Sequence, residues 1–116
     1  MNPAILVGVG GTFGALARHL VGQRVETDYA DTLAVNVIGS FLLGTIVAAP
    51  LGDPIALAFG TGFCGAFTTF STFAFETVRL YETGQRRRAL ANASIHLVAA
   101  LVAVGLGSLL VGIVLG

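Results

Sequence analysis

Residues 62–73 read GFCGAFTTFSTF, which places two glycines, four phenylalanines and a group of hydroxyl side chains between two apolar stretches. A third glycine, Gly60, comes just before this run. Glycines form helix poorly, and the core of a soluble domain rarely accepts so many hydroxyl groups beside aromatic rings. The rest of the chain has to show which environment suits this segment.

The composition is that of a membrane protein. Of the 116 residues, 55% are hydrophobic and only 10% are charged, and the mean hydropathy is +0.90. A very apolar soluble domain is the alternative, but the apolar residues occur in stretches of bilayer length. The net charge of zero and the absence of a basic stripe argue against nucleic-acid binding. Cys64 is the only cysteine, which excludes an intrachain disulfide.

Four hydrophobic spans are predicted, at about residues 4–21, 32–49, 54–81 and 89–115. Each approaches the roughly 20 residues that a helix needs to cross hydrocarbon. The connectors are short, so successive helices should be antiparallel neighbours. We therefore expect an all-α membrane protein with a single four-helix domain over residues 1–116, located in the plasma membrane.

Arginines are distributed asymmetrically along the chain, and lysine is absent. All six lie at or beside the first and third connections: Arg18, Arg24, Arg79, Arg86, Arg87 and Arg88. The positive-inside rule then favours cytoplasmic arginine loops and external termini. Gly10 and Gly14 stand four apart in the first span, a spacing that lets helices approach closely, either within the subunit or at a subunit interface.

Polar side chains inside the spans are the main functional candidates, because each needs a partner or water. Thr32, Asn36 and Ser40 follow at i, i+4 and i+8 on one helical face. Asn36 is either an interhelical hydrogen-bonding residue or an amide donor that faces a pathway. Asn92 and His96 repeat the four-residue spacing in the last span. No other His, Asp or Glu is spaced to complete a metal site with His96, so we assign none.

The opening segment can now be interpreted. A helix that breaks among these glycines and hydroxyl residues leaves carbonyl oxygens unpaired at membrane depth, which is tolerated where the break lines water or binds a cation. We expect the third helix to break at mid-membrane. Phe70 and Phe73, three residues apart, are either core residues or a pair whose electropositive ring edges hold an anion weakly.

The chain resembles the CrcB/Fluc fluoride channels over nearly its whole length. The resemblance rests on GGTFGALAR (residues 10–18), TLAVNVIGSFLLG (residues 32–44) and GFCGAFTTFSTFAFE (residues 62–76). It implies a passive, fluoride-specific ion channel, not an enzyme, that lets fluoride leave the cell. It also implies an antiparallel dimer with two pores and a central structural sodium ion.

Site residues follow from the same resemblance. The sodium ion would be bound by backbone carbonyls of Gly65 and Thr68 from both subunits. The fluoride pathway would include the aromatic pair and neighbouring donors, and an arginine would lie at the pore mouth: Asn36, Thr69, Phe70, Ser71, Thr72, Phe73 and Arg18. Fluoride is compact and strongly hydrated, so it needs several close hydrogen-bond donors, and amide and hydroxyl groups supply them.

The fourth span departs from the family pattern of a tyrosine followed four residues later by a serine. Here Asn92 and His96 take these places and form a candidate polar track. This departure and the arginine asymmetry suggest a heterodimer with a paired homologue of opposite orientation, with a homodimer as the alternative.

The sequence leaves two functions as alternatives to a fluoride channel. A small multidrug-type exporter would need an acid in its first helix, where this chain has none, and Glu76 in the third span can pair with Arg79. The second alternative is a non-conducting membrane assembly subunit.

Overall fold

The chain is helical throughout the parts that its computed structural model describes, residues 2–25 and 29–116. The elements are α1 (Pro3–Arg24), α2 (Ala30–Ala48), α3 (Asp53–Ala56), η1 (Leu57–Cys64), α4 (Gly65–Phe67), α5 (Phe70–Glu82) and α6 (Arg86–Leu115). The stretch Asp53–Glu82 acts as one span, so four helical spans are long and apolar enough to cross a membrane. The expectation of an all-helical protein with four such spans is confirmed, and the chain is a multi-pass membrane protein.

The third span changes its backbone geometry twice. In η1 the helix widens to π geometry, where the N–H of Gly65 donates to the carbonyl of Gly60, five residues earlier. Regular helix stops at Phe67 and resumes at Phe70, because Thr68 (φ −83°, ψ 163°) and Thr69 (φ −146°, ψ 114°) have extended backbone. The extended residues are thus the hydroxyl residues, while the glycines before them stay helical.

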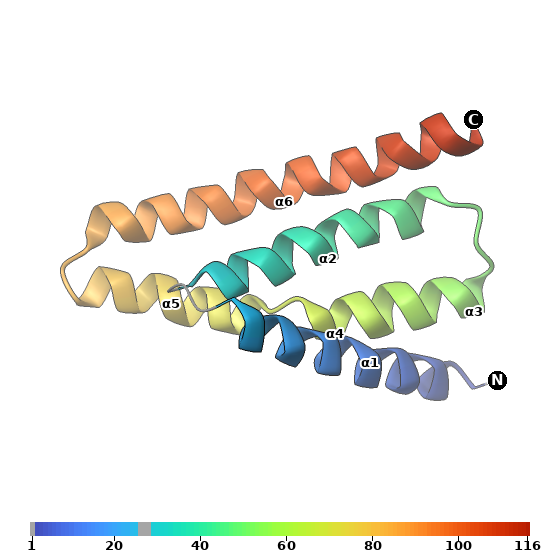
Figure 1. Ribbon diagram of the computed structural model, residues 1–116, viewed down its shortest axis with the longest axis horizontal. Coiled ribbons are helices and arrows are strands. Elements are labelled where there is room, and N and C mark those ends of the chain that lie inside the picture. The colour runs from blue at the N-terminus through green and yellow to red at the C-terminus, as the bar shows by residue number, and fades with distance from the viewer. Residues whose placement is uncertain (1, 26–28) are drawn as a thin grey trace.

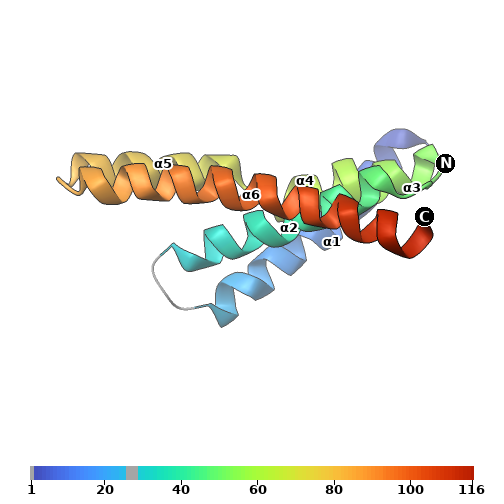
Figure 2. The same cartoon turned by 90° about the horizontal axis from the view of Figure 1, so that it is seen from above.

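The helices pack mainly as two layers (Figure 1). α2 lies along α6, and α1 lies along η1 and α4, while α5 returns beside the first part of α6. Both termini lie at one end of the molecule, and the turn between α5 and α6 lies at the other. Figure 2 shows that, on the side away from the two termini, the α5–α6 hairpin extends beyond the end of α1 and the start of α2. The groove described below opens between these layers.

Glycines permit the closest helix contacts. A Cβ atom at Gly14 would overlap the carbonyl of Phe63, and one at Gly44 would overlap the carbonyl of Val104. The first contact joins α1 to η1, and the second joins α2 to α6. Such backbone approach is how helices associate where apolar side chains gain little from leaving lipid. These glycines therefore pack within the subunit, whereas a Cβ atom at Gly112 would meet nothing within 4 Å.

Local signals define the helix ends. Pro3 occupies the first turn of α1, and the side chain of Asn2 accepts a hydrogen bond from the N–H of Ala4 at 2.8 Å. Gly84 ends α5 with a left-handed φ of 85°, which glycine adopts without steric cost. The chain then reverses directly into α6. Asn2 and Pro3 thus set where the first span begins, and Gly84 sets where the third span ends and the last span begins.

Candidate functional site

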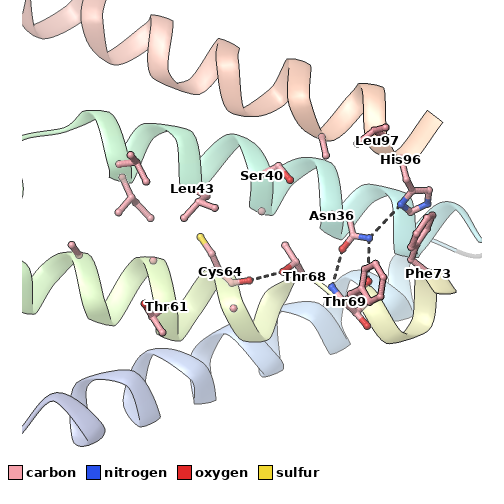
Figure 3. A pocket seen from close by; sticks show the side chains of 18 of the residues that line it. Asn36, Ser40, Leu43, Thr61, Cys64, Thr68, Thr69, Phe73, His96 and Leu97 are labelled. Atoms are coloured by element: carbon pink, nitrogen blue, oxygen red, sulfur yellow. Dashed lines mark hydrogen bonds between the residues drawn. The ribbon is translucent and has the colours of Figure 1, made fainter. Parts of the chain in front are cut away.

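Asn36 of α2 bonds to the extended part of the third span. Its Oδ1 accepts the N–H of Thr69 at 2.8 Å, and its Nδ2 donates to the carbonyl of the same residue at 3.2 Å. In a continuous helix the Thr69 N–H would instead bond to the carbonyl of Gly65, four residues earlier. The Asn36 side chain thus satisfies both backbone groups of Thr69. The interhelical hydrogen bond, left open by the sequence, is present (Figure 3).

Hydroxyl groups gather at the start of α5. Thr69 caps this helix, since its Oγ1 accepts the N–H of Thr72 at 3.2 Å. The same Oγ1 lies 3.0 Å from the hydroxyl of Thr72 and 3.5 Å from that of Ser71. Ser71 and Thr72 are exposed in the single subunit. The predicted pathway residues Asn36, Thr69, Ser71 and Thr72 therefore lie together.

The two predicted aromatic residues form a pair. The ring centroids of Phe70 and Phe73 are 5.8 Å apart, with an angle of 52° between the ring planes. Phe73 also contacts the imidazole of His96 at 4.5 Å between centroids. Phe70 is 79% exposed, so its ring is free to meet lipid or another subunit. Phe73, in contrast, is half-buried and lies against His96.

The fourth span contributes one residue of the candidate polar track to this cluster. His96 is buried, and its Nδ1 lies 3.3 Å from the Nδ2 of Asn36. Asn92, one turn earlier, instead donates to the hydroxyl of Thr77 at 2.9 Å. Thr77 in turn donates to the carbonyl of Phe73. His96 therefore faces the Asn36 cluster, while Asn92 joins α6 to α5.

Two cavities meet at Thr69. The first is a groove of about 670 Å³, mostly apolar, between α2, the third span and α6 (Figure 3). Its walls include Asn36, Phe73 and His96. The second has a volume of about 480 Å³ and is more polar, with Arg18 and Thr72 among its lining residues. Thr69 lines both cavities, so the extended segment separates them.

Gly65 and Thr68 both line the first groove. The Thr68 hydroxyl donates to the carbonyl of Cys64 at 2.9 Å, and its own carbonyl leaves the helical direction because ψ is 163°. Because the Thr69 N–H donates to Asn36, the carbonyl of Gly65 lacks the backbone donor that a helix would give it. Two oxygen atoms are thus available to a hard cation. Within the described residues, His, Cys, Asp and Glu form no group of three that could hold a metal.

Sequence reasoning missed the role of Glu76. This side chain is buried, and its Oε2 accepts a hydrogen bond from Thr32 at 3.1 Å. The described residues show no ion pair between Glu76 and Arg79, whose side chain is exposed, so the expected local pair is replaced by an interhelical bond. Thr32 also lines the second cavity. The four-residue spacing of Thr32 and Asn36 was the available signal, since it puts both on the face of α2 that meets α5.

Comparison with known proteins identifies the family. The model of the family described as "CrcB-like protein, Camphor Resistance (CrcB)" matches residues 5–108. A fluoride-specific ion channel, FluC 2 of Natronomonas pharaonis, is 55% identical over 104 residues, which cover 90% of each chain. FluC of Methanocaldococcus jannaschii is 46% identical over 113 residues, and FluC 2 of Haloarcula marismortui is 47% identical over 108, each match covering 91% of both chains.

These matches extend over the four helical spans and the site around Asn36. The chain belongs to the CrcB-like family of membrane proteins. The resemblance drawn from its three sequence segments is therefore confirmed.

Proposed function

We propose that this chain forms a passive, fluoride-specific channel through which fluoride leaves the cytoplasm. The observation that supports this most directly is the pairing of Asn36 with the backbone of Thr69 at 2.8 and 3.2 Å, beside Phe73 and between two cavities. Relatives of 46–55% identity that bear the name fluoride-specific ion channel support the choice of ion.

Uncharged donors suit this task. The hydroxyl groups of Ser71 and Thr72 are exposed beside Thr69, and phenylalanine ring edges are electropositive. Together they replace part of the water around a small anion without the strong attraction of a full charge, which would slow its release. Both Nδ2 hydrogens of Asn36 are directed at protein acceptors, Thr69 and His96. An ion that bonds to Asn36 must therefore displace one of these contacts.

A second subunit of opposite orientation would complete the pathway. Phe70 and the groove beside it are exposed in the single chain, which leaves one wall of each pore to a partner. Two such pores would follow from the symmetry of an antiparallel dimer. The arginine asymmetry favours a paired homologue as the partner, and a second copy of this chain is the alternative.

A structural sodium ion fits the break in the third span. Backbone carbonyls freed by unwinding coordinate sodium in other membrane proteins. Gly65 and Thr68 offer two such oxygens per subunit, and we place the break at mid-membrane, where the two subunits would meet. Bound there, the ion would hold the two extended segments together. In the same dimer Arg18, at the second cavity, would lie at the pore mouth.

The test is fluoride efflux from liposomes that contain the purified dimer, recorded with a fluoride electrode. We expect rapid efflux from the native protein and loss of most of it in Phe73→Ile, because an aliphatic side chain has no electropositive edge. Phe59→Ile is the matched control, since Phe59 is exposed in η1 and lines neither cavity.

Two outcomes would contradict the proposal in different ways. Native dimers that pass no fluoride would refute the function. Equal efflux through Phe73→Ile and the native protein would remove the role of the aromatic pair. Preparing the liposomes with and without sodium tests the structural ion, whose removal should lower efflux by destabilising the dimer.

A further inference from the structure

Asn36 fixes the hydrogen-bonding role of His96. The N–H of Thr69 is a donor, so the Asn36 atom 2.8 Å from it must be the acceptor Oδ1. The amide nitrogen then faces the Thr69 carbonyl and the Nδ1 of His96, at 3.2 and 3.3 Å. Because Nδ2 has only hydrogens to offer, Nδ1 must accept. The neutral imidazole therefore carries its proton on Nε2.

That Nε2–H group is buried and has no hydrogen-bond partner in the described part of the chain. The His96 side chain is only 6% exposed and lines the first groove. Leaving a buried donor unpaired is unfavourable, because the group loses its hydrogen bond to water and gains none in exchange. The wall of the groove therefore contains a buried donor that no group in the described residues satisfies.

A second proton on His96 conflicts with this arrangement. Protonation puts a hydrogen on Nδ1, so that two donors would face each other across the 3.3 Å between His96 and Asn36. Turning the Asn36 amide over would remove the conflict. The turned amide, however, would point its NH₂ group at the Thr69 N–H and its oxygen at the Thr69 carbonyl, and both bonds would be lost. Protonation of one imidazole is thus coupled to release of the extended segment.

We propose that Asn36 and His96 form a proton-sensitive latch on Thr69, which holds the segment between the two cavities in its conducting form only while His96 is neutral. The proposal rests on the proposed function, because its readout is conduction. Acid should lower conduction, since release of Thr69 removes the donors that Asn36 and the α5 cap hold in register.

Other ionisable groups lie near the latch and have to be distinguished from His96. α5 contributes Glu76, bonded to Thr32 one turn from Asn36, and the first turn of α2 contains Asp31. Arg18 and His19 of α1 line the second cavity together with Asp31. On α6 the neighbour one turn away, Asn92, is uncharged. Variants at Glu76 and His19 therefore separate the sources of any acid response.

The first test measures efflux from liposomes with equal pH inside and outside, between about pH 5 and about pH 8, the range in which histidine titrates. We expect fast efflux at the upper limit and, below the midpoint, a fall of about tenfold per pH unit, as for loss of a single neutral group. Protein-free liposomes correct for neutral HF, which crosses lipid in acid. Absence of efflux at the upper pH limit would contradict the proposed function. Efflux that does not change with pH would overturn the latch alone.

His96→Gln is the decisive variant. A glutamine can accept from Asn36 and still offer an N–H group, but it does not titrate, so we expect its efflux to be independent of pH. His19→Gln and Glu76→Gln should retain the acid response. An acid response that persists in His96→Gln, or that disappears in either of the other two, would overturn the latch.

A spectroscopic readout holds even if His96→Gln fails to assemble. Histidine ¹⁵N shifts in the His19→Gln dimer report on His96 alone, because the chain has two histidines. We expect the Nε2–H tautomer at the upper pH limit and a protonation step that coincides with the fall in efflux. An Nδ1–H tautomer, or a step at a different pH from that fall, would refute the proposal.

Discussion

Asn36 illustrates how one side chain can replace missing backbone hydrogen bonds. Its amide has one acceptor and two donor positions, and the three contacts at 2.8, 3.2 and 3.3 Å use both kinds. Two of them satisfy the N–H and carbonyl of Thr69, which water cannot do inside hydrocarbon. The same amide holds the ring of His96 in one tautomer. Structure and proposed conduction thus depend on the same group.

Asn36→Asp tests whether the amide donor is needed, with almost no change in the size of the side chain. The carboxylate keeps an acceptor for the Thr69 N–H but points a second oxygen at the Thr69 carbonyl and at the Nδ1 of His96. We expect loss of fluoride efflux and a drop of about 1–3 kcal/mol in stability for each buried group left unpaired. Thermal unfolding in detergent measures the second effect.

Thr45→Val is the control in the same helix. It removes a hydroxyl whose hydrogen bond is local, to the carbonyl of Leu42, so efflux should persist. An Asn36→Asp channel with native stability and efflux would show that the amide donor is unnecessary.

The third span shows how a helix can exchange some of its own backbone hydrogen bonds for bonds to a neighbouring helix and still stay packed. Before the break, Gly62 packs tightly against α1, since a Cβ atom there would overlap α1 backbone. The extended residues come next, where Asn36 of α2 provides alternative bonds to Thr69. The Thr69 hydroxyl then starts α5 as its cap. The element is therefore held from both sides, by α1 before the break and by α2 at it.

The close contact between α2 and α6 gives a second prediction. Gly44→Ala should destabilise the subunit by about 1–3 kcal/mol, because the new methyl group would overlap the Val104 carbonyl and push α2 away from α6. Gly105→Ala on the facing helix is the matched control, since its methyl group would meet nothing within 4 Å. Alanine also favours helix over glycine, so that variant should be as stable as the native chain or more stable. Equal unfolding temperatures for the two variants would contradict this account of the α2–α6 contact.

At the scale of the whole molecule, most large apolar side chains point outward. Leu90, Ile113 and Val114 of α6 are about 70% exposed in the single chain, which suits a surface covered by lipid or by another subunit. The arginine-rich turn between α5 and α6 lies at the opposite end from both termini. Charge and shape therefore give the molecule two different ends.

This polarity predicts one dominant orientation for the chain expressed alone. We expect a C-terminal reporter to lie outside the cytoplasm, because Arg86, Arg87 and Arg88 retain their turn on the cytoplasmic side. Replacing all three with Gln should give a mixed orientation, whereas replacing them with Lys should leave the orientation unchanged. Native C-termini on both faces, together with fluoride efflux from the single product, would favour a homodimer and end the case for an obligate homologous partner.

Much of this architecture follows from local sequence. Stretches of bilayer length predicted four spans, and the structure shows four that are long and apolar enough. Helix periodicity placed Thr32 and Asn36 on one face of a helix. These features depend on neighbours a few residues apart, so composition and spacing are enough to reveal them.

Pairings between spans depended on the tertiary structure. Asn36 meets Thr69 across 33 positions and His96 across 60, and Thr32 meets Glu76 across 44. Spacing within one helix cannot rank such partners, because each polar side chain has several possible neighbours on the facing helices. Packing at the glycine contacts sets the distance and rotation of the helices. That geometry alone decides that Asn36 binds Thr69, that Glu76 bonds to Thr32 and not to Arg79, and that the Nδ1 of His96 faces Asn36.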